Sequence, residues 1–155
     1  MIDTKRVTAV AEEEFVVFLI GMRINKWWKF HQWVPVALQM MRMLKELYRN
    51  PELGLLHHEQ WFGRTTMMVQ YWKSLEHLQA YAKNAAGKHP DAWKKFNRRV
   101  GQNGDVGIWH ETYLSGPGRY ENIYVNMPSF GMGSAFKRLE ADGKYKTSME
   151  RINAQ

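Results

Sequence analysis

The sequence predicts an α+β fold of the ferredoxin-like βαββαβ type with one extra C-terminal strand. Three observations lead to this prediction. Apolar runs typical of strands alternate with segments in which apolar residues recur at helical spacing. The 155 residues, of which 45% are hydrophobic and 14% aromatic, suffice for one domain with a sizeable core. Several predicted strands are apolar on both faces, which a lone sheet with helices on one side would leave partly exposed.

The first strand of this order covers residues 15–22, and residues 1–13 form a short lead-in before it. A dense aromatic segment, residues 27–33, then leads into a helix over about residues 34–49. The apolar side chains of this helix lie on one stripe, and Asn50-Pro51 ends it, because proline cannot continue a helix.

Two further strand-like runs, about residues 53–61 and 65–72, are joined by a short glycine-containing link and predict a hairpin. Ser74 caps the helix that follows, and the stretch over residues 84–88 is expected to break it. A new helix begins at His89-Pro90, because the missing N–H of proline costs nothing at a first helical position.

A strand over residues 106–114 and an extra strand over residues 120–126 complete the order, with a Gly-Pro-Gly turn signal between them. A tail runs from about residue 129 to residue 155. We therefore expect residues 1–155 to form a single domain. A second copy packed sheet to sheet would bury the free apolar face, so the sequence predicts a homodimer of the kind called a dimeric α+β barrel.

Composition narrows the classes of function. The chain has no cysteine, which excludes disulfides, thiolate catalysis and cysteine-ligated zinc or haem. The formal charge of +7 is spread along the chain without a nucleic-acid-binding pattern, so we expect no nucleic acid partner. No stretch approaches the roughly 20 apolar residues of a membrane span, and the start lacks a hydrophobic signal core. These features predict a cytoplasmic protein.

Two histidines are the first candidate functional residues. From His89, the apolar Trp93 and Phe96 follow at helical spacing. His110 lies in a predicted strand, on the face that carries Ile108 and Thr112, and the alternate face carries Glu111. Both imidazoles are therefore expected to face an apolar interior. Imidazole is a common metal ligand and titrates near neutral pH, although a lone inward histidine is more often a core residue.

Two other segments admit alternative interpretations. His57-His58-Glu59 lies on a predicted strand, where neighbours point to opposite faces, so two adjacent residues cannot easily hold one metal; zinc bound by Glu59 with one of the histidines stays open. The aromatic segment over residues 27–33 is interpreted as packing at an interface or at a barrel mouth. The alternative is weak contact with a membrane surface or a pocket lid.

The whole chain resembles a family of bacterial and fungal monooxygenase-like proteins in the dimeric α+β barrel superfamily. The resemblance rests on three motifs: Ile24-Asn25-Lys26-Trp27-Trp28, Trp109-His110-Glu111-Thr112-Tyr113, and the run from Tyr120 to Pro128. It implies a small hydrophobic substrate. In a cofactor-independent monooxygenase of the antibiotic-biosynthesis type, His110 would deprotonate an electron-rich aromatic substrate, and Asn122 or Tyr124 would position it.

A narrower resemblance links residues 74–126 to the haem-binding segment of aldoxime dehydratases, through His89-Pro90, Trp109-His110-Glu111 and Tyr120-Glu121-Asn122. It implies haem as cofactor, His89 as the axial ligand of the iron, and His110 with Glu111 as the acid–base group.

In this resemblance Trp93 and Phe96 would contact the haem, and Arg23 or Arg64 would replace the distal arginine of that site. The chain is much shorter than those enzymes, and their distal serine has no counterpart here. The sequence thus leaves three hypotheses: a haem-dependent enzyme, a cofactor-independent monooxygenase, and a non-enzymatic module that binds haem or a hydrophobic ligand.

Overall fold

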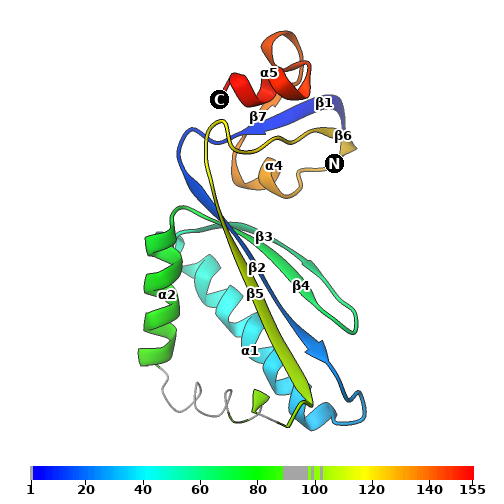
Figure 1. The fold of residues 1–155 in the computed structure, drawn as a ribbon, viewed down its shortest axis with the longest axis vertical. Coiled ribbons are helices and arrows are strands. Elements are labelled where there is room, and N and C mark those ends of the chain that lie inside the picture. Colours follow the sequence, from blue (N-terminus) through cyan, green and yellow to red (C-terminus); the bar gives the residue numbers. More distant parts are fainter. Residues whose placement is uncertain (1, 89–97, 99, 102) are drawn as a thin grey trace.

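The computed structural model consists of two antiparallel sheets, of which the larger carries helices on one face (Figure 1). It describes residues 2–88, 98, 100, 101 and 103–155. The larger sheet contains four strands: β2 (Phe15–Ile24), β3 (Leu55–Trp61), β4 (Met67–Trp72) and β5 (Val106–Ser115). The smaller sheet contains three: β1 (Asp3–Val10), β6 (Tyr124–Met127) and β7 (Lys137–Glu140).

The strand order of the larger sheet confirms the predicted α+β class. The order is β3-β4-β2-β5, with every neighbouring pair antiparallel. Strand β4 therefore lies between β2 and β3, which are consecutive in the chain, and β2 lies between β4 and β5. This interleaving is the split βαβ arrangement that the βαββαβ order predicts. Sequential helical connections thus fall on one face of the sheet.

Two helices cover that face, α1 (Phe30–Arg49) and α2 (Leu75–Lys88) (Figure 1). Helix α1 begins four residues before the predicted start, so half of the aromatic segment is helical. Helix α2 continues through residues 84–88, where a break was predicted. That prediction was wrong because alanines 85 and 86 favour the helix enough to offset the cost of Gly87.

The core lies between these helices and the sheet. Apolar side chains of β2, β3 and β4 that share the helix-facing side pack against α1 and α2. Trp72 is 1% exposed, and its indole N–H donates to the Gln70 amide oxygen at 2.9 Å, so the polar edge of the ring is satisfied inside the core. The buried members are Val16, Leu44, Leu47, Leu55, Met68, Trp72, Leu78 and Tyr81.

The smaller sheet has the order β6-β1-β7 and is built from both ends of the chain. The expected lead-in, residues 1–13, contains β1 as its central strand. The expected tail after residue 129 contains α4 (Met132–Ala135), β7, a 3-10 turn over Gly143–Tyr145 and α5 (Ser148–Asn153). A second 3-10 turn, Pro51–Leu53, follows α1. The extra strand, β6, starts at Tyr124 and joins this sheet instead of the larger one.

The smaller sheet and α4 pack over one end of the larger sheet, on the face opposite the helices (Figure 1). Side chains from both sheets form one cluster there: Ala9, Ala11, Phe15 and Met132, with Val17, Tyr71, Tyr120, Tyr124 and Phe136 around them. We call the face of the larger sheet opposite α1 and α2 the open face.

Within the described part of the chain, each helix is too short or too polar to cross a membrane.

Candidate functional site

Four titratable side chains meet where the smaller sheet covers the open face. They are His57 and Glu59 of β3, Tyr71 of β4 and Tyr124 of β6. Glu59, Tyr71 and Tyr124 lie next to Gly131 in the turn before α4, and His57 contacts Glu59. We call this group the junction cluster. All four side chains are half-buried.

Strand register brings the first three residues together. His57 pairs directly with Tyr71, and Glu59, two residues along β3, lies on the same face. A β-bulge between Leu55 and His57 shifts the alternation of β3, so that Leu55 faces the helices and His57 faces away. The smaller sheet then brings Tyr124 over this row. The site therefore depends on packing of residues more than 50 positions apart.

The Glu59 carboxylate organises the cluster. Its Oε1 accepts the Gly131 backbone N–H at 2.9 Å and contacts the His57 Nε2 at 3.0 Å. A carboxylate oxygen can only accept, so the His57 Nε2 carries the proton in this contact. The Nδ1 nitrogen of His57 is then the basic nitrogen of a neutral ring. A histidine oriented in this way by a carboxylate is a typical general base.

The two tyrosines are protonated hydrogen-bonding groups at neutral pH. Burial raises the pKa of Tyr71 to about 12, and the nearby Tyr124 and Glu59 add to this shift. Burial also raises the pKa of Tyr124, whose hydroxyl oxygen accepts the Gly133 N–H at 3.3 Å. Gly131 has φ of 55°, and a Cβ there would lie 3.2 Å from the Tyr71 hydroxyl oxygen, so glycine permits this close approach.

His58 confirms that neighbours on β3 point to opposite faces. Its Nδ1 lies 2.6 Å from the Tyr48 hydroxyl of α1, on the helix side of the sheet. Burial lowers the pKa of His58, and the His57 imidazole lowers it further. Of the two histidines His57 and His58, only His57 contacts the Glu59 carboxylate. Among the residues that the structure describes, no group of three or more histidine, aspartate or glutamate side chains could hold a metal ion.

His110 and Glu111 do not form a common site. They are adjacent on β5, so His110 points to the helix side, where its ring lies 5.7 Å from the Phe18 ring, and Glu111 points to the open face. There Glu111 accepts the Tyr113 hydroxyl. His110 therefore lies on the predicted face of its strand, but its side chain is exposed there and not buried, because β5 is the edge strand of the sheet.

The predicted substrate-binding residues lie apart from one another. The Asn122 amide is used within the fold: Nδ2 donates to the Ala9 carbonyl at 2.9 Å, and Oδ1 accepts the Ala9 N–H at 2.7 Å. The side-chain amide of Asn122 thus bonds to the backbone of β1 as a neighbouring strand would. Its nitrogen and oxygen are therefore already used within the fold and are not free to bind a substrate. Arg23, at the far end of β2, donates to the Thr65 hydroxyl at 2.8 Å. Of the three, Tyr124 alone joins the junction cluster.

The predicted cofactor residues His89, Trp93 and Phe96 lie outside the described residues. Ligation of haem by His89 therefore stays a prediction. His110, its expected distal partner, is exposed on β5.

The sequence indicated His57 and Glu59 only as possible zinc ligands, and it did not indicate Tyr71 as a functional residue. The signal was present in part, because His-x-Glu on a strand places both side chains on one face. What the sequence could not indicate was the bulge before His57 and its contact with the turn at Gly131, which lies more than 70 residues further along the chain. The contact with Gly131 distinguishes this pair from a chance surface pair.

Comparisons with known proteins complete the description of the site. The family model described as Monooxygenase af470-like matches residues 15–132, a range that contains every member of the junction cluster. Monooxygenase af470 of Aspergillus fumigatus is 35% identical over 86 residues, which are 52% of this chain and 30% of the fungal protein. The chain therefore spans less than a third of that relative.

A crystal structure of a dimeric ferredoxin-like protein from an uncultured marine organism has 18% identity and a TM-score of 0.40. The match covers 67% of this chain and 96% of that chain.

Proposed function

Because the chain belongs to the Monooxygenase af470-like family, we propose that it is a monooxygenase-type enzyme whose acid–base centre is the junction cluster. One observation supports this placement above the others: the His57 imidazole contacts the Glu59 carboxylate beside two half-buried tyrosines. The chain covers only 30% of the fungal monooxygenase, so the activity proposed is that of this domain's own residues.

The substrate class follows from what a base with protonated phenols around it can do. We propose a substrate with an acidic CH2 group between aromatic rings or beside a carbonyl, as in an anthrone. The His57 Nδ1 removes one proton from this carbon, and the resulting carbanion gives an electron to dioxygen. The two radicals combine into a C–O bond, and loss of water leaves a carbonyl. The substrate thus loses two hydrogens and gains one oxygen atom, and the second oxygen leaves as water.

Each member of the cluster has a role in this proposal. Glu59 is a positioning residue that holds the tautomer of His57 and stabilises its protonated form. Tyr71, whose pKa of about 12 keeps it protonated, donates a hydrogen bond to the enolate oxygen that develops when the proton is removed. Tyr124 closes the other side of the cluster.

The test is oxygen uptake by the purified protein with anthrone as the probe, with spontaneous oxidation subtracted. We expect His57→Gln to lower kcat/KM by about 100-fold or more, the usual contribution of a general base. Tyr71→Phe should lower kcat by about tenfold with little change in KM, because its hydrogen bond strengthens in the transition state. Glu59→Gln should shift the acidic limb of the pH–rate profile to lower pH, because the protonated imidazole of His57 would lose its carboxylate partner.

Two matched histidine variants serve as controls. His31→Gln changes an exposed histidine of α1 and should leave the rate unchanged. His110→Gln tests the role that the sequence indicated for that residue. Full activity of His57→Gln together with loss in His110→Gln would move the base to the helix side of β5 and overturn our placement. Uptake equal to the spontaneous rate for the wild type with a panel of such substrates would overturn the proposed function.

Haem binding is a separate prediction that rests on His89. It is tested by adding haem to the protein and recording the Soret band, which His89→Ala should abolish. The predicted resemblance to aldoxime dehydratases depends on the same spectrum.

We also propose that the chain forms a homodimer through the open face. The row across this face contains Leu19 and Val69 between Glu59 and Glu111, and the neighbouring Tyr113 is 52% exposed. The smaller sheet covers only the end near Val17 and Tyr71. A two-fold partner packed on the remainder would bury this apolar strip.

A further inference from the structure

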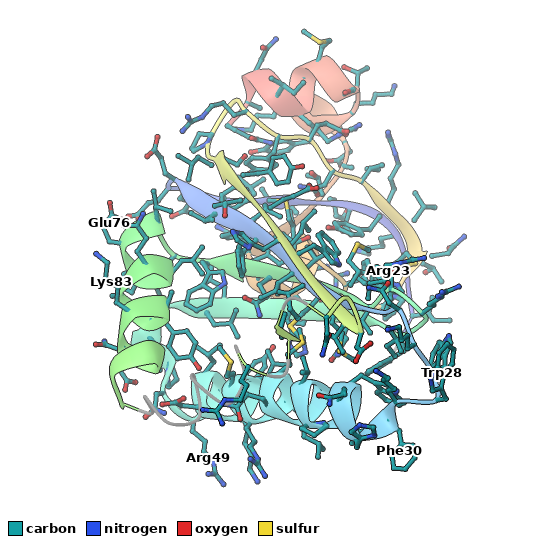
Figure 2. The ribbon with its side chains drawn as sticks, turned by 60° about the horizontal axis from the view of Figure 1, so that its bottom comes forward. Arg23, Trp28, Phe30, Arg49, Glu76 and Lys83 are labelled. Carbon is teal, nitrogen blue, oxygen red and sulfur yellow. The ribbon has the colours of Figure 1, made fainter. Side chains whose placement is uncertain are left out.

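The end of the molecule where β2 leads into α1 carries an exposed aromatic surface. Phe62, Trp28 and Phe30 are 78%, 72% and 64% exposed, and Trp27 is also exposed. Figure 2 shows Trp28 and Phe30 projecting at this end of the molecule. We call this surface, with its neighbouring cations Arg23 and Arg64, the aromatic tip. Large aromatic rings left in water in a group mark an interaction site more often than single exposed residues do.

Hydrogen bonds hold the two segments of the tip side by side. The Ile24 N–H donates to the Arg64 carbonyl at 2.8 Å, and the Arg23 guanidinium donates to the Thr65 hydroxyl at 2.8 Å. The Arg64 guanidinium donates back to the Ile24 carbonyl at 3.3 Å. The β3–β4 hairpin, which carries Phe62, is therefore tied to the β2–α1 loop, which carries Trp28.

The loop presents Trp28 from a braced base. The Trp33 indole N–H donates to the Trp27 carbonyl at 3.1 Å, and the Trp27 and Trp33 rings meet edge to face at 5.9 Å. Lys26 and Lys29 both bind the buried Asp105 carboxylate, at 2.7 and 2.8 Å. Because Trp28 lies between these fixed points, its exposure is a built feature of the loop.

The tip is also strongly basic. Residues 21–35 and 60–73 contain no aspartate or glutamate. Of the nearby cations, Lys26 and Lys29 share one carboxylate, and Arg23 and Arg64 bind only neutral groups in the contacts described. Helix α1 starts in this surface without an acidic residue in its first turn and without a side-chain cap, so its N-terminal dipole adds to the positive potential.

We propose that the aromatic tip binds the surface of a membrane that contains anionic lipids. Tryptophan and phenylalanine enter the boundary between headgroups and acyl chains, and arginine binds lipid phosphates. A second copy of the chain bound at this surface would bring two positively charged tips together, and the two tips would repel each other. The combination of aromatic rings with uncompensated cations therefore fits a lipid surface best. This inference is independent of the proposed monooxygenase activity.

The experiment is sedimentation of the full chain with vesicles of phosphatidylcholine alone and of phosphatidylcholine with about one-third phosphatidylserine. We expect binding to the anionic vesicles that weakens as salt rises. Arg23→Gln should weaken binding about fivefold, and Trp28→Ser with Phe62→Ser about tenfold or more. Brominated lipids should quench tryptophan fluorescence less in Trp28→Phe, which keeps the apolar ring.

The controls lie at the opposite end of the chain's fold. Met149→Ser removes a side chain that is 63% exposed on α5, and Lys137→Gln removes an exposed cation of β7. Both should bind like the wild type. Equal binding of tip and control variants would overturn the proposal, as would no binding to anionic vesicles. Self-association without vesicles that Trp28→Ser abolishes would show instead that a second copy covers the tip.

Discussion

Gly21 of β2 allows a close approach of neighbouring groups in the larger sheet. A Cβ at this position would lie 2.0 Å from the Thr66 carbonyl oxygen and 2.7 Å from the Trp109 indole nitrogen. The indole N–H of Trp109 donates to that same carbonyl at 3.3 Å. The missing side chain therefore makes room for a tryptophan that bridges β5 to the start of β4.

We expect Gly21→Ala to destabilise the fold by about 3 kcal/mol, because the clash is with backbone and cannot be relieved by a side-chain rotation. Urea unfolding followed by circular dichroism measures this change. Gly63→Ala is the matched control: its Cβ would meet only the Thr65 carbonyl, at 3.6 Å, so the change should be within about 0.5 kcal/mol. Equal stabilities of the two variants would contradict the close contact at Gly21.

At the scale of elements, one buried carboxylate joins β5 to the β2–α1 loop. Asp105 is 1% exposed in its side chain and binds the ammonium groups of Lys26 and Lys29. Its backbone carbonyl accepts the Asn25 N–H at 3.1 Å. The hydrogen bonds from Lys26 and Lys29 hold the pKa of Asp105 below its usual value. A group with a lowered pKa in the folded state stabilises the fold above its unfolded pKa and loses this effect as pH falls.

We therefore expect Asp105→Asn to lower the Tm by several degrees at pH 6, because two cations lose their shared counter-ion. The difference from the wild type should shrink as the pH falls below about 4, where the carboxylate of the wild type also becomes neutral. Thermal unfolding at pH 6 and at pH 2.5 measures both values. Glu12→Gln, at an exposed position between β1 and β2, is the control; a pH-independent difference for Asp105→Asn would contradict this account.

The elements differ in how well their sequences predict them. Strand β2 and helix α1 bury continuous apolar patterns, so the pattern alone indicates them. The sequence predicts a lead-in over residues 1–13, where the structure forms strand β1; the polar run from Thr4 to Arg6 gives no alternating strand pattern. This segment forms a strand because β6 and β7 pair with both of its edges and bury Val7 and Ala9. Such pairing between the two ends of a chain leaves no local signal.

The candidate site, like strand β1, depends on contacts between distant segments that leave no local signal in the sequence. That His57 and Glu59 share a face could be predicted from alternation, but their value as a site depends on Gly131 and Tyr124, which long-range packing supplies. For His110 the strand and the face were predicted correctly. The burial of His110 was not predicted correctly. Burial depends on which strand lies at the edge of the sheet, and the sequence of one strand does not indicate its place in the strand order.

At the scale of the whole molecule, the two sheets divide the open face into a covered end and an apolar remainder. The covered end holds the junction cluster, and the remainder holds Leu19 and Val69 at its centre. A homodimer formed there would place two junction clusters beside the interface. It would need to bury about 800 Å² on each copy, the usual size of a stable interface.

We expect the wild type to have twice the mass of the 18.3 kDa chain in light scattering at micromolar concentration. Leu19→Lys should give the monomer mass, because it places an ammonium group in the middle of an apolar interface, where the group would lose its hydration. Leu38→Lys is the control: it changes a side chain of α1 that is 53% exposed, and this variant should remain dimeric.

Circular dichroism separates loss of the dimer from loss of the fold, since a folded monomer keeps the helical signal of α1 and α2. If the Leu19→Lys variant unfolds, the wild type can be diluted instead. Its mass in light scattering and its helical circular dichroism signal should then both fall as the protein concentration falls. A wild type that stays at the mass of one chain at high concentration would contradict the interface. The open face would then face solvent, with Leu19 and Val69 half-buried by neighbours in their own chain.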